Sequence, residues 1–479
     1  MKNYILFTLI LFSSQIFGQE DISKNMSLTE YLGYVKAFHP IVKQANLVIN
    51  ESEAKLLKER GAFDPKFEME RSQKNFKGIE YYDKLNASFK IPTWYGIEFK
   101  GNFEDNEGLY LNPEASVPDN GLYSVGVSVS VAQNLLINKR MAMLKQAKLY
   151  VNQAKADRTI LVNNILFEAT KTYFNWLKAY NEKNVYNDFL DNAEIRFKGI
   201  KKNYEVGENP AIDTLEARIT LTTRKLDFEK ARINYIKSSL ELSNFLWLDD
   251  NTPIEIKDNI IPDIRTVNNI DDYYAPLLLN SESFNLENHP KLQSLNFKYE
   301  SLIIDKRLKQ NSLLPKIDLQ YNFLSETPEV VNSFSTSAYK SGFNISIPLF
   351  LRKERGEVNL TKIKLQNTEF EMKATKVTIK NKIDGISQEL ESYTIQNQYT
   401  ESMVNDYETM LNAEERKFFL GESSLFLVNS RESKLIDAKL LLKPFTQVYL
   451  SFKEALRILR KMKYRPVRSN TRIKWKWKL

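Results

Sequence analysis

The feature that most constrains this chain is an internal repeat, because its second half follows its first half motif by motif. His39-Pro40 recurs as His289-Pro290, and the segment 202–208 recurs as 416–422, each copy ending in Gly-Glu. Other segments match in the same order: 63–67 with 313–317, 129–131 with 345–347, and the helix from Leu144 with that from Leu360. Such self-similarity predicts two copies of one structural plan.

Each copy is predicted to contain one very long helix, a glycine turn and a second helix. The long helices are expected near 136–204 and 352–419, and about 70 residues at 1.5 Å each give on the order of 100 Å. Apolar residues such as Leu360, Ile363 and Phe370 recur at intervals of three and four, which favours side-by-side helix packing. On the helices alone, a soluble coiled coil or helical bundle remains an alternative.

A shorter helix is predicted to open each copy. In the first copy it runs from about Leu28 to Glu59, with Ser27 as its N-cap. Its counterpart runs from about His289 to Asn311. His39 and His289 each precede a proline, which pushes the preceding residue out of the α region. We therefore interpret both histidines as marks of a helix start rather than as metal ligands or acid–base groups.

Between the short and long helices, both copies carry segments in which apolar and polar residues alternate. The clearest segments are 85–91, 124–131, 317–323 and 343–347. Period-two alternation is typical of membrane β-barrel strands, although an antiparallel sheet with one wet face gives the same pattern. The equivalent places of the strands in the two copies favour the barrel. In the first copy, 85–91 and its neighbour 96–103 form an extra pair, which is either an additional barrel hairpin or an extension beyond the membrane surface.

The strand count predicts an oligomer. Each copy supplies at least one hairpin, so one chain offers at least four strands. The smallest membrane barrels have eight, and an open sheet edge is not tolerated in lipid. Several chains must therefore share one barrel, and three chains would supply twelve strands.

The N-terminus predicts export. Lys2 is followed by the apolar run Tyr4–Phe12 and by a small residue, Gly18, at a plausible cleavage point, as in a secretory signal peptide. No later stretch reaches the roughly 18 to 20 apolar residues of a transmembrane helix, so the exported chain is expected to be either soluble or a β-barrel. The chain has no cysteine, which excludes disulfides, cysteine metal ligands and lipidation of a cysteine thiol.

The net charge of +8 reflects mainly a basic C-terminus, because Arg457 to Leu479 contains ten Lys or Arg residues and no acidic residue. In an exported protein we interpret this segment as a mobile solvated terminus or as a tail held by acidic surface groups, and we expect no nucleic acid partner. The expected division of the chain is a signal peptide at 1–18, a first repeat at 19–250 (strands about 66–131, helix pair about 136–248), a linker at 251–285, a second repeat at 286–463 (strands about 316–347, helix pair about 352–461) and the basic tail at 464–479.

Several of these features together resemble the outer-membrane efflux protein (TolC) family. They are the doubled plan, the His-Pro opening of each half, the strand exit 347–350, the Gly-Glu pattern after each long helix, and the segment Asp213–Arg218 in the first copy. The resemblance extends from about Leu28 to Lys461. It implies a mainly α fold with membrane strands: a homotrimer with a twelve-stranded β-barrel in the lipid of the outer membrane, continued by a long helical barrel in the periplasm. It also implies a periplasmic membrane-fusion adaptor and an inner-membrane pump as partners.

The resemblance also implies where the functional residues lie. Gly207 and Gly421 would form turns at the periplasmic tip, and Glu208 and Glu422 would face the adaptor. A glycine that merely ends a helix is the alternative for each position.

The periplasmic gate departs from the family pattern. Members that close this end with an aspartate ring carry acids six and nine positions after the second turn glycine, where this chain has Leu427 and Ser430. The first copy keeps Asp213 and Glu216. Asp213, with Glu216 and Arg218, is therefore a candidate lock that acts through a salt bridge or hydrogen bond.

The sequence contains none of the usual catalytic signatures. It has no phosphate-binding glycine loop, no HExxH and no serine elbow, so we expect no enzyme activity, no cofactor and no metal site. The predicted function is a passive exit duct for small molecules in a tripartite efflux system. The alternatives are a duct for type I protein secretion and a soluble periplasmic coiled-coil scaffold or adaptor.

Overall fold

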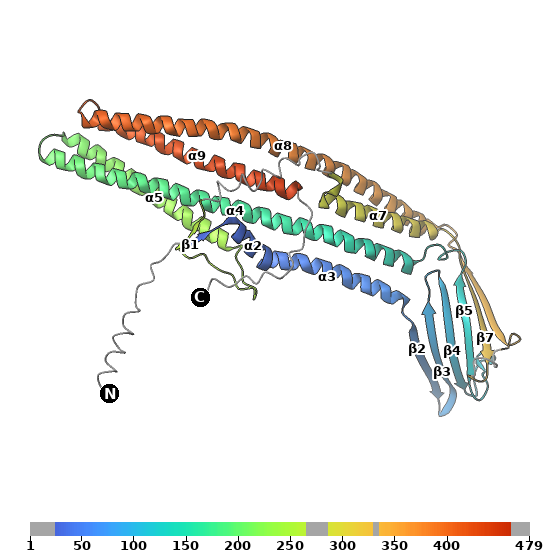
Figure 1. Cartoon of the computed structure of the whole chain (residues 1–479). Coiled ribbons are helices and arrows are strands. Elements are labelled where there is room, and N and C mark those ends of the chain that lie inside the picture. The colour runs from blue at the N-terminus through green and yellow to red at the C-terminus, as the bar shows by residue number, and fades with distance from the viewer. Residues whose placement is uncertain (1–23, 265–285, 329–334, 461–479) are drawn as a thin grey trace, which may run out of the picture. The chain divides into compact units, whose positions relative to one another are not determined.

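The computed structural model describes residues 24–264, 286–328 and 335–460 (Figure 1). The expected signal peptide and basic tail, and most of the expected linker, lie outside these residues. The described residues form two compact units: unit 1 comprises 24–45, 161–264 and 379–460, and unit 2 comprises 46–160, 286–328 and 335–378. Each repeat contributes segments to both units.

Unit 2 contains one antiparallel sheet of six strands (Figure 1). In chain order the strands are β2 (Lys66–Phe76), β3 (Ile79–Pro92), β4 (Ile97–Glu107), β5 (Leu122–Ser130), β7 (Lys316–Ser325) and β8 (Tyr339–Ser346). Their order in the sheet is the same as in the chain, so β5 of the first repeat pairs with β7 of the second. The ambiguous pair of segments lies in β3 and β4, inside the sheet. The described part of one chain therefore supplies six strands to this sheet, and three chains would supply eighteen rather than twelve.

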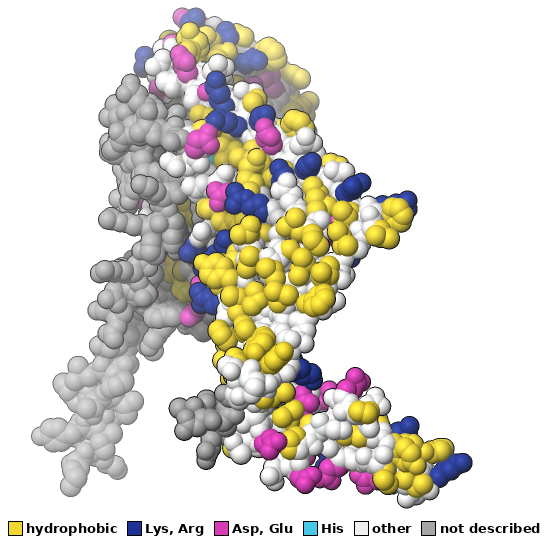
Figure 2. All heavy atoms as spheres, turned by 90° about the vertical axis from the view of Figure 1, so that its right-hand side faces the viewer, with side chains coloured by type: hydrophobic (Ala, Val, Ile, Leu, Met, Phe, Trp, Pro, Cys, Tyr) yellow, Lys and Arg dark blue, Asp and Glu magenta, His cyan; other side chains and the backbone are white. Residues whose placement is uncertain are grey.

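One face of the sheet is apolar. Phe99, Val127 and Tyr321 lie in one cross-strand row, while their sequence neighbours Lys100, Ser128 and polar residues of β7 point to the opposite face because side chains alternate along a strand. The apolar side chains are exposed, for example Phe343 at 76%. Apolar side chains gather in a broad patch on the strand-bearing side of the molecule (Figure 2). The sheet thus presents an apolar surface that the described residues do not cover.

Two local features set the sheet geometry. Lys77 and Gly78, with φ of 55° and 74°, form the two-residue turn between β2 and β3, which matches the twist of paired strands. On β5, a Cβ at position 126 would collide with the Asn322 side chain and the Tyr321 carbonyl on β7. Glycine at 126 therefore permits the close approach of the two repeats at the β5–β7 seam.

The helix that opens the first repeat is interrupted, so the expectation of one continuous helix from Leu28 to Glu59 is wrong. The chain forms α2 (Leu28–Phe38) and α3 (Pro40–Arg60), and between them His39 is extended, with φ −60° and ψ 131°. The interruption arises because proline disfavours α geometry in the residue before it.

Both histidines act as N-caps of the helix that follows. His39 Nδ1 accepts a hydrogen bond from the backbone N–H of Ile41 at 3.2 Å, and His289 Nδ1 accepts one from Lys291 at 3.1 Å at the start of α7 (Pro290–Asn311). Burial lowers the pKa of both imidazoles and so favours the neutral ring, in which one nitrogen can accept a hydrogen bond. The helix-start interpretation agrees with this geometry.

Unit 1 is built on two helix hairpins. The first joins α4 (Lys139–Glu205) to α5 (Ala211–Ser243), and the second joins α8 (Arg352–Phe419) to α9 (Leu425–Arg460). The segments of α4 and α8 from Leu161 and Ile379 onward belong to this unit. None of the described helices is both long and apolar enough to cross a membrane.

The largest core of unit 1 is aromatic and surrounds a short parallel pair of strands, β1 (Lys24–Met26) and β6 (Ile260–Pro262). Tyr173 and Trp176 of α4 are fully buried there. The Tyr173 hydroxyl donates to the Met26 carbonyl at 2.8 Å, so the polar end of a buried ring is satisfied. This core ties the N-terminal segment to the helix hairpin α4–α5.

Candidate functional site

The turns of the two hairpins have the same backbone geometry. Gly207 has φ 84° and Gly421 has φ 75°. The N–H of Glu208 donates to the carbonyl five residues earlier at 2.8 Å, and that of Glu422 does the same at 2.8 Å. A left-handed residue with a hydrogen bond of this span is a Schellman motif, which ends a helix and reverses the chain.

The turns also leave the same residues exposed. Nothing lies within 4 Å of a Cβ placed at Gly207 or Gly421, so the positive φ rather than crowding requires glycine. Glu208 and Glu422 are both exposed. Beneath the turns, Ile200, Ala217 and Leu425 form a buried apolar cluster. The result is a pair of similar acidic turns mounted on a packed base.

The three candidate lock residues have different environments. Asp213 accepts a hydrogen bond from Asn209 Nδ2 at 3.0 Å, within its own turn. Glu216 accepts one from Asn429 Nδ2 at 3.1 Å and so joins α5 to α9. Arg218 is exposed on α5. Of the three, Glu216 makes the contact between hairpins, whereas the Asp213 contact is local.

A buried carboxylate, Glu432 on α9, joins the two hairpins through two arginines. Its side chain is 0% exposed, and its Oε1 lies 3.1 Å from Arg224 of α5. Its Oε2 lies 2.7 Å from Nη1 of Arg196 on α4. Arg196 also contacts Glu415 of α8 at 3.1 Å. We call Arg196, Arg224, Glu415 and Glu432 the hairpin network.

The hairpin network contains one residue from each of the four helices. Neutral groups add hydrogen bonds to the two arginines: Arg196 donates to Asn429 at 3.3 Å and Arg224 donates to Ser433 at 3.1 Å. Buried charges are costly unless they are paired and hydrogen-bonded, and removal of one partner leaves an uncompensated charge. The network therefore resists separation of the hairpins and fixes their relative register.

Sequence reasoning missed the hairpin network, although a signal for it exists. On α9, Leu425, Val428, Glu432 and Leu435 are spaced three and four residues apart and all are buried. Arg224 likewise lies seven residues from the buried Ala217. A charged residue among the regularly spaced buried positions of a helix predicts a buried ion pair. The pattern on one helix does not show which other helix supplies the partner.

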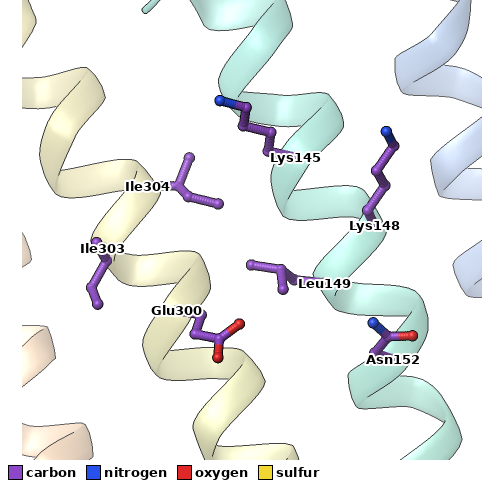
Figure 3. A pocket seen from close by; sticks show the side chains of 7 residues that line it. All are labelled: Lys145, Lys148, Leu149, Asn152, Glu300, Ile303 and Ile304. Carbon is purple, nitrogen blue, oxygen red and sulfur yellow. The ribbon is translucent and has the colours of Figure 1, made fainter.

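Unit 2 has a groove between α4 and α7, with a volume of about 350 Å³. Lys145, Lys148, Leu149 and Asn152 line it from α4, and Glu300, Ile303 and Ile304 line it from α7 (Figure 3). The lysine heads point apart rather than toward one centre (Figure 3). Within the described ranges, no group of three or more His, Cys, Asp or Glu could hold a metal ion.

A sheet with an exposed apolar face, combined with two hairpins of very long helices, defines the class of TolC-like outer-membrane channels. The sequence agrees: residues 105–246 and 284–457 match the model of the outer membrane efflux protein family, and the chain belongs to that family. It is an outer-membrane efflux channel protein that extends into the periplasm. Channels of this family are homotrimers that interact with adaptors and pumps. No curated protein matches the chain in sequence.

Solved structures share the fold at low sequence identity. The Campylobacter jejuni CmeC outer membrane channel is 15% identical, with a TM-score of 0.63 over 90% of this chain and 85% of that one. The outer membrane protein VceC from Vibrio cholerae is 13% identical, with a TM-score of 0.63 over 90% and 95%. The open state of the Neisseria gonorrhoeae MtrE outer membrane channel is 11% identical, with a TM-score of 0.61 over 91% and 88%.

Proposed function

We propose that three copies of this chain form the outer-membrane exit duct of a tripartite efflux system, which exports small molecules passively. The observation that carries the proposal is the combination, in one chain, of a lipid-compatible apolar sheet face and paired long-helix hairpins. No reactive constellation is needed for such a duct, because the energy comes from the inner-membrane pump. The polar face of the sheet, with residues such as Ser128, Gln320 and Asn344, would line the water-filled path.

The two hairpin turns are proposed as the adaptor-docking surface. Glu208 and Glu422 are exposed, similarly placed and rigidly held by their Schellman motifs. A binding surface on rigid turns loses little conformational entropy on association. Basic groups on the adaptor would complement the two carboxylates, and such contacts affect the association rate and its salt dependence most.

The hairpin network is proposed as the lock of the closed duct. Opening the periplasmic end requires the hairpins to move, and the network together with the Glu216–Asn429 contact opposes that movement. Asp213 contributes through the conformation of its own turn. The lock therefore relies on buried ion pairs between helices instead of an acidic ring at Leu427 and Ser430.

The proposal is tested by deleting the gene and measuring both cargo classes. Accumulation of a panel of dyes, drugs and metal ions should rise in the deletion strain and return to normal when the intact chain is restored. The secreted proteins of the same cells should be unchanged. A loss of one secreted protein with unchanged dye and drug accumulation would favour a protein-secretion duct. Recovery of the mature chain in the soluble periplasmic fraction, as a monomer in mild detergent, would exclude a duct altogether.

A further inference from the structure

The six-stranded sheet has two open edges, β2 and β8. Every residue of β2 and of β8 is exposed, whereas most residues of β4 and β5 are half-buried. An edge strand carries backbone N–H and C=O groups without partners, and lipid cannot satisfy them. None of the strands that the structure describes covers either edge, so a strand of a neighbouring copy is the natural partner of each.

The two edges are complementary in direction. All five pairings in the sheet are antiparallel. With six strands in alternating directions, β2 runs opposite to β8. The β2 edge of one copy can therefore pair with the β8 edge of a neighbouring copy in the same antiparallel pattern, and the pattern repeats around a closed ring.

The apolar faces also match across such a pairing. Phe67 and Met69 lie on the apolar face of β2, and Phe343 and Ile345 lie on that of β8. Both pairs lie close to the helix-proximal ends of their strands. If Phe67 lies opposite Ile345, Met69 lies opposite Phe343, and the apolar surface continues from one copy to the next at these helix-proximal positions.

The polar faces match in charge under the same register. Glu70 on β2 then lies opposite Gly342 and diagonal to Lys340 on β8, within reach of a cross-strand ion pair. Within the part of the chain that the structure describes, neither Glu70 nor Lys340 forms a salt bridge of its own. Two opposite charges are thus available at the two edges.

The sheet already has the stagger that a barrel requires. Successive pairings lead from Phe67 on β2 through Val125 on β5 to Tyr339 on β8. Phe67 is the apolar residue of β2 nearest the helix, but the corresponding residue of β8 is Ile345, not Tyr339. The displacement along β8 from Tyr339 to Ile345 is the shear that a barrel with tilted strands requires.

The hairpin β3–β4 is an integral part of this sheet. Asp83–Pro92 pairs with Glu98–Glu107 without a register shift, and Ile97–Glu104 pairs in the same way with Leu122–Val129. A twelve-stranded barrel would use only four strands of each chain, so that two strands of each sheet would have to separate from their neighbours. That separation would break a continuous ladder of hydrogen bonds.

We propose that β2 of one copy pairs with β8 of the next, so that three copies close a barrel of eighteen strands. The proposal rests on the trimer of the proposed function. Barrel diameter grows roughly linearly with strand number. At about 4.8 Å between strands and a tilt of about 40°, eighteen strands give a backbone-to-backbone diameter of about 36 Å, against about 24 Å for twelve.

Disulfide trapping tests the pairing directly, because the chain has no cysteine of its own. Met69→Cys and Phe343→Cys are introduced together, at side chains that are 63% and 76% exposed and therefore tolerant of replacement. Mild oxidation in isolated outer membranes should give disulfide-linked multimers on a non-reducing denaturing gel. Met69→Cys is also combined with Ser341→Cys and with Ile345→Cys to cover neighbouring registers. The matched control, Met69→Cys with Asn344→Cys, places the thiols on opposite faces and should stay monomeric.

A second pair tests the twelve-stranded alternative. If β4 rather than β2 forms the outer edge, Phe99→Cys should link to Phe343→Cys of the neighbouring copy. That link, or a native trimer in which none of the Met69 pairs links, overturns the eighteen-stranded barrel while leaving the duct intact. Absence of the trimer on a native gel of the unmodified protein instead refutes the proposed function, so the two failures are distinguishable.

Discussion

Glu432→Gln is expected to weaken unit 1 and to loosen the channel. The side chain keeps its shape but loses its charge, while two guanidinium groups remain beside it. Breaking a buried ion pair by removing one partner costs about 3–5 kcal/mol. Arg196 retains Glu415 and Asn429 as partners, so we expect a loss near the lower end, about 3 kcal/mol.

The matched control is Glu415→Gln, which removes the other carboxylate of the hairpin network. Glu415 is 43% exposed, and an ion pair at such a site contributes about 1 kcal/mol or less. Guanidinium unfolding of the detergent-solubilised protein, followed by helical circular dichroism, gives both free energies. Conductance in planar bilayers should rise for Glu432→Gln and stay near the parental value for Glu415→Gln.

A double variant separates the ion pair from simple loss of packing. Arg224→Met combined with Glu432→Gln removes a buried charge of each sign, so its loss of stability should be smaller than the sum of the two single losses. The reasoning is refuted if Glu432→Gln and Glu415→Gln lose the same free energy of unfolding, or if the double variant is strictly additive.

Three further expectations follow from individual positions. Gly207→Ala should lower the free energy of unfolding by about 1–2 kcal/mol because the φ of Gly207 is 84°. The control Gly199→Ala, inside α4 with open space around it, should instead stabilise the helix by up to about 1 kcal/mol. The unfolding midpoints of the two variants test this, and equal shifts would contradict the role of φ. Gly126→Ala should prevent pairing at the β5–β7 seam and lower the yield of folded protein in the outer membrane, whereas Gly101→Ala, with no atom within 4 Å of the new Cβ, should not. Burial lowers the pKa of His289 in the folded protein, so the unfolded chain binds more protons than the folded chain below about pH 6.5. The free energy of unfolding should therefore fall as the pH drops through that range. His289→Asn, which keeps a capping side chain, should remove this part of the pH dependence.

The repeat and the two residue periodicities account for most of what the sequence predicts of the fold. Twin Gly-Glu motifs located both hairpin turns, because a positive φ has a specific residue signature. Pro40 already indicates a helix start after His39, but the prediction of one continuous helix from Leu28 to Glu59 does not include the break there. The strand β2 is hard to recognise in the sequence because its apolar and polar residues alternate only weakly. Arg71 and Gln73 occupy its otherwise apolar face.

The hairpin network shows where sequence reasoning on the site ends. Position within a helix stripe can indicate that Glu432 is buried. It cannot indicate that Arg196, more than two hundred residues away in the sequence, lies beside it. Contacts of this kind depend on which helices pair and in what register along their axes. That information lies in the assembled hairpins rather than in any short segment of the sequence.

The β5–β7 seam has a consequence for the order of folding. β2 to β5 form a meander of local contacts within the first repeat, whereas β5 meets β7 only after all of α4, α5 and α7 has been made. Contacts between distant parts of a chain form more slowly than local ones. As the chain is exported from its N-terminus, the four-stranded meander can form early and then wait with β5 exposed. Before the β5–β7 pairing forms, a periplasmic chaperone would protect the exposed edge of β5. The formation of this pairing is therefore the step that commits the chain to the complete sheet.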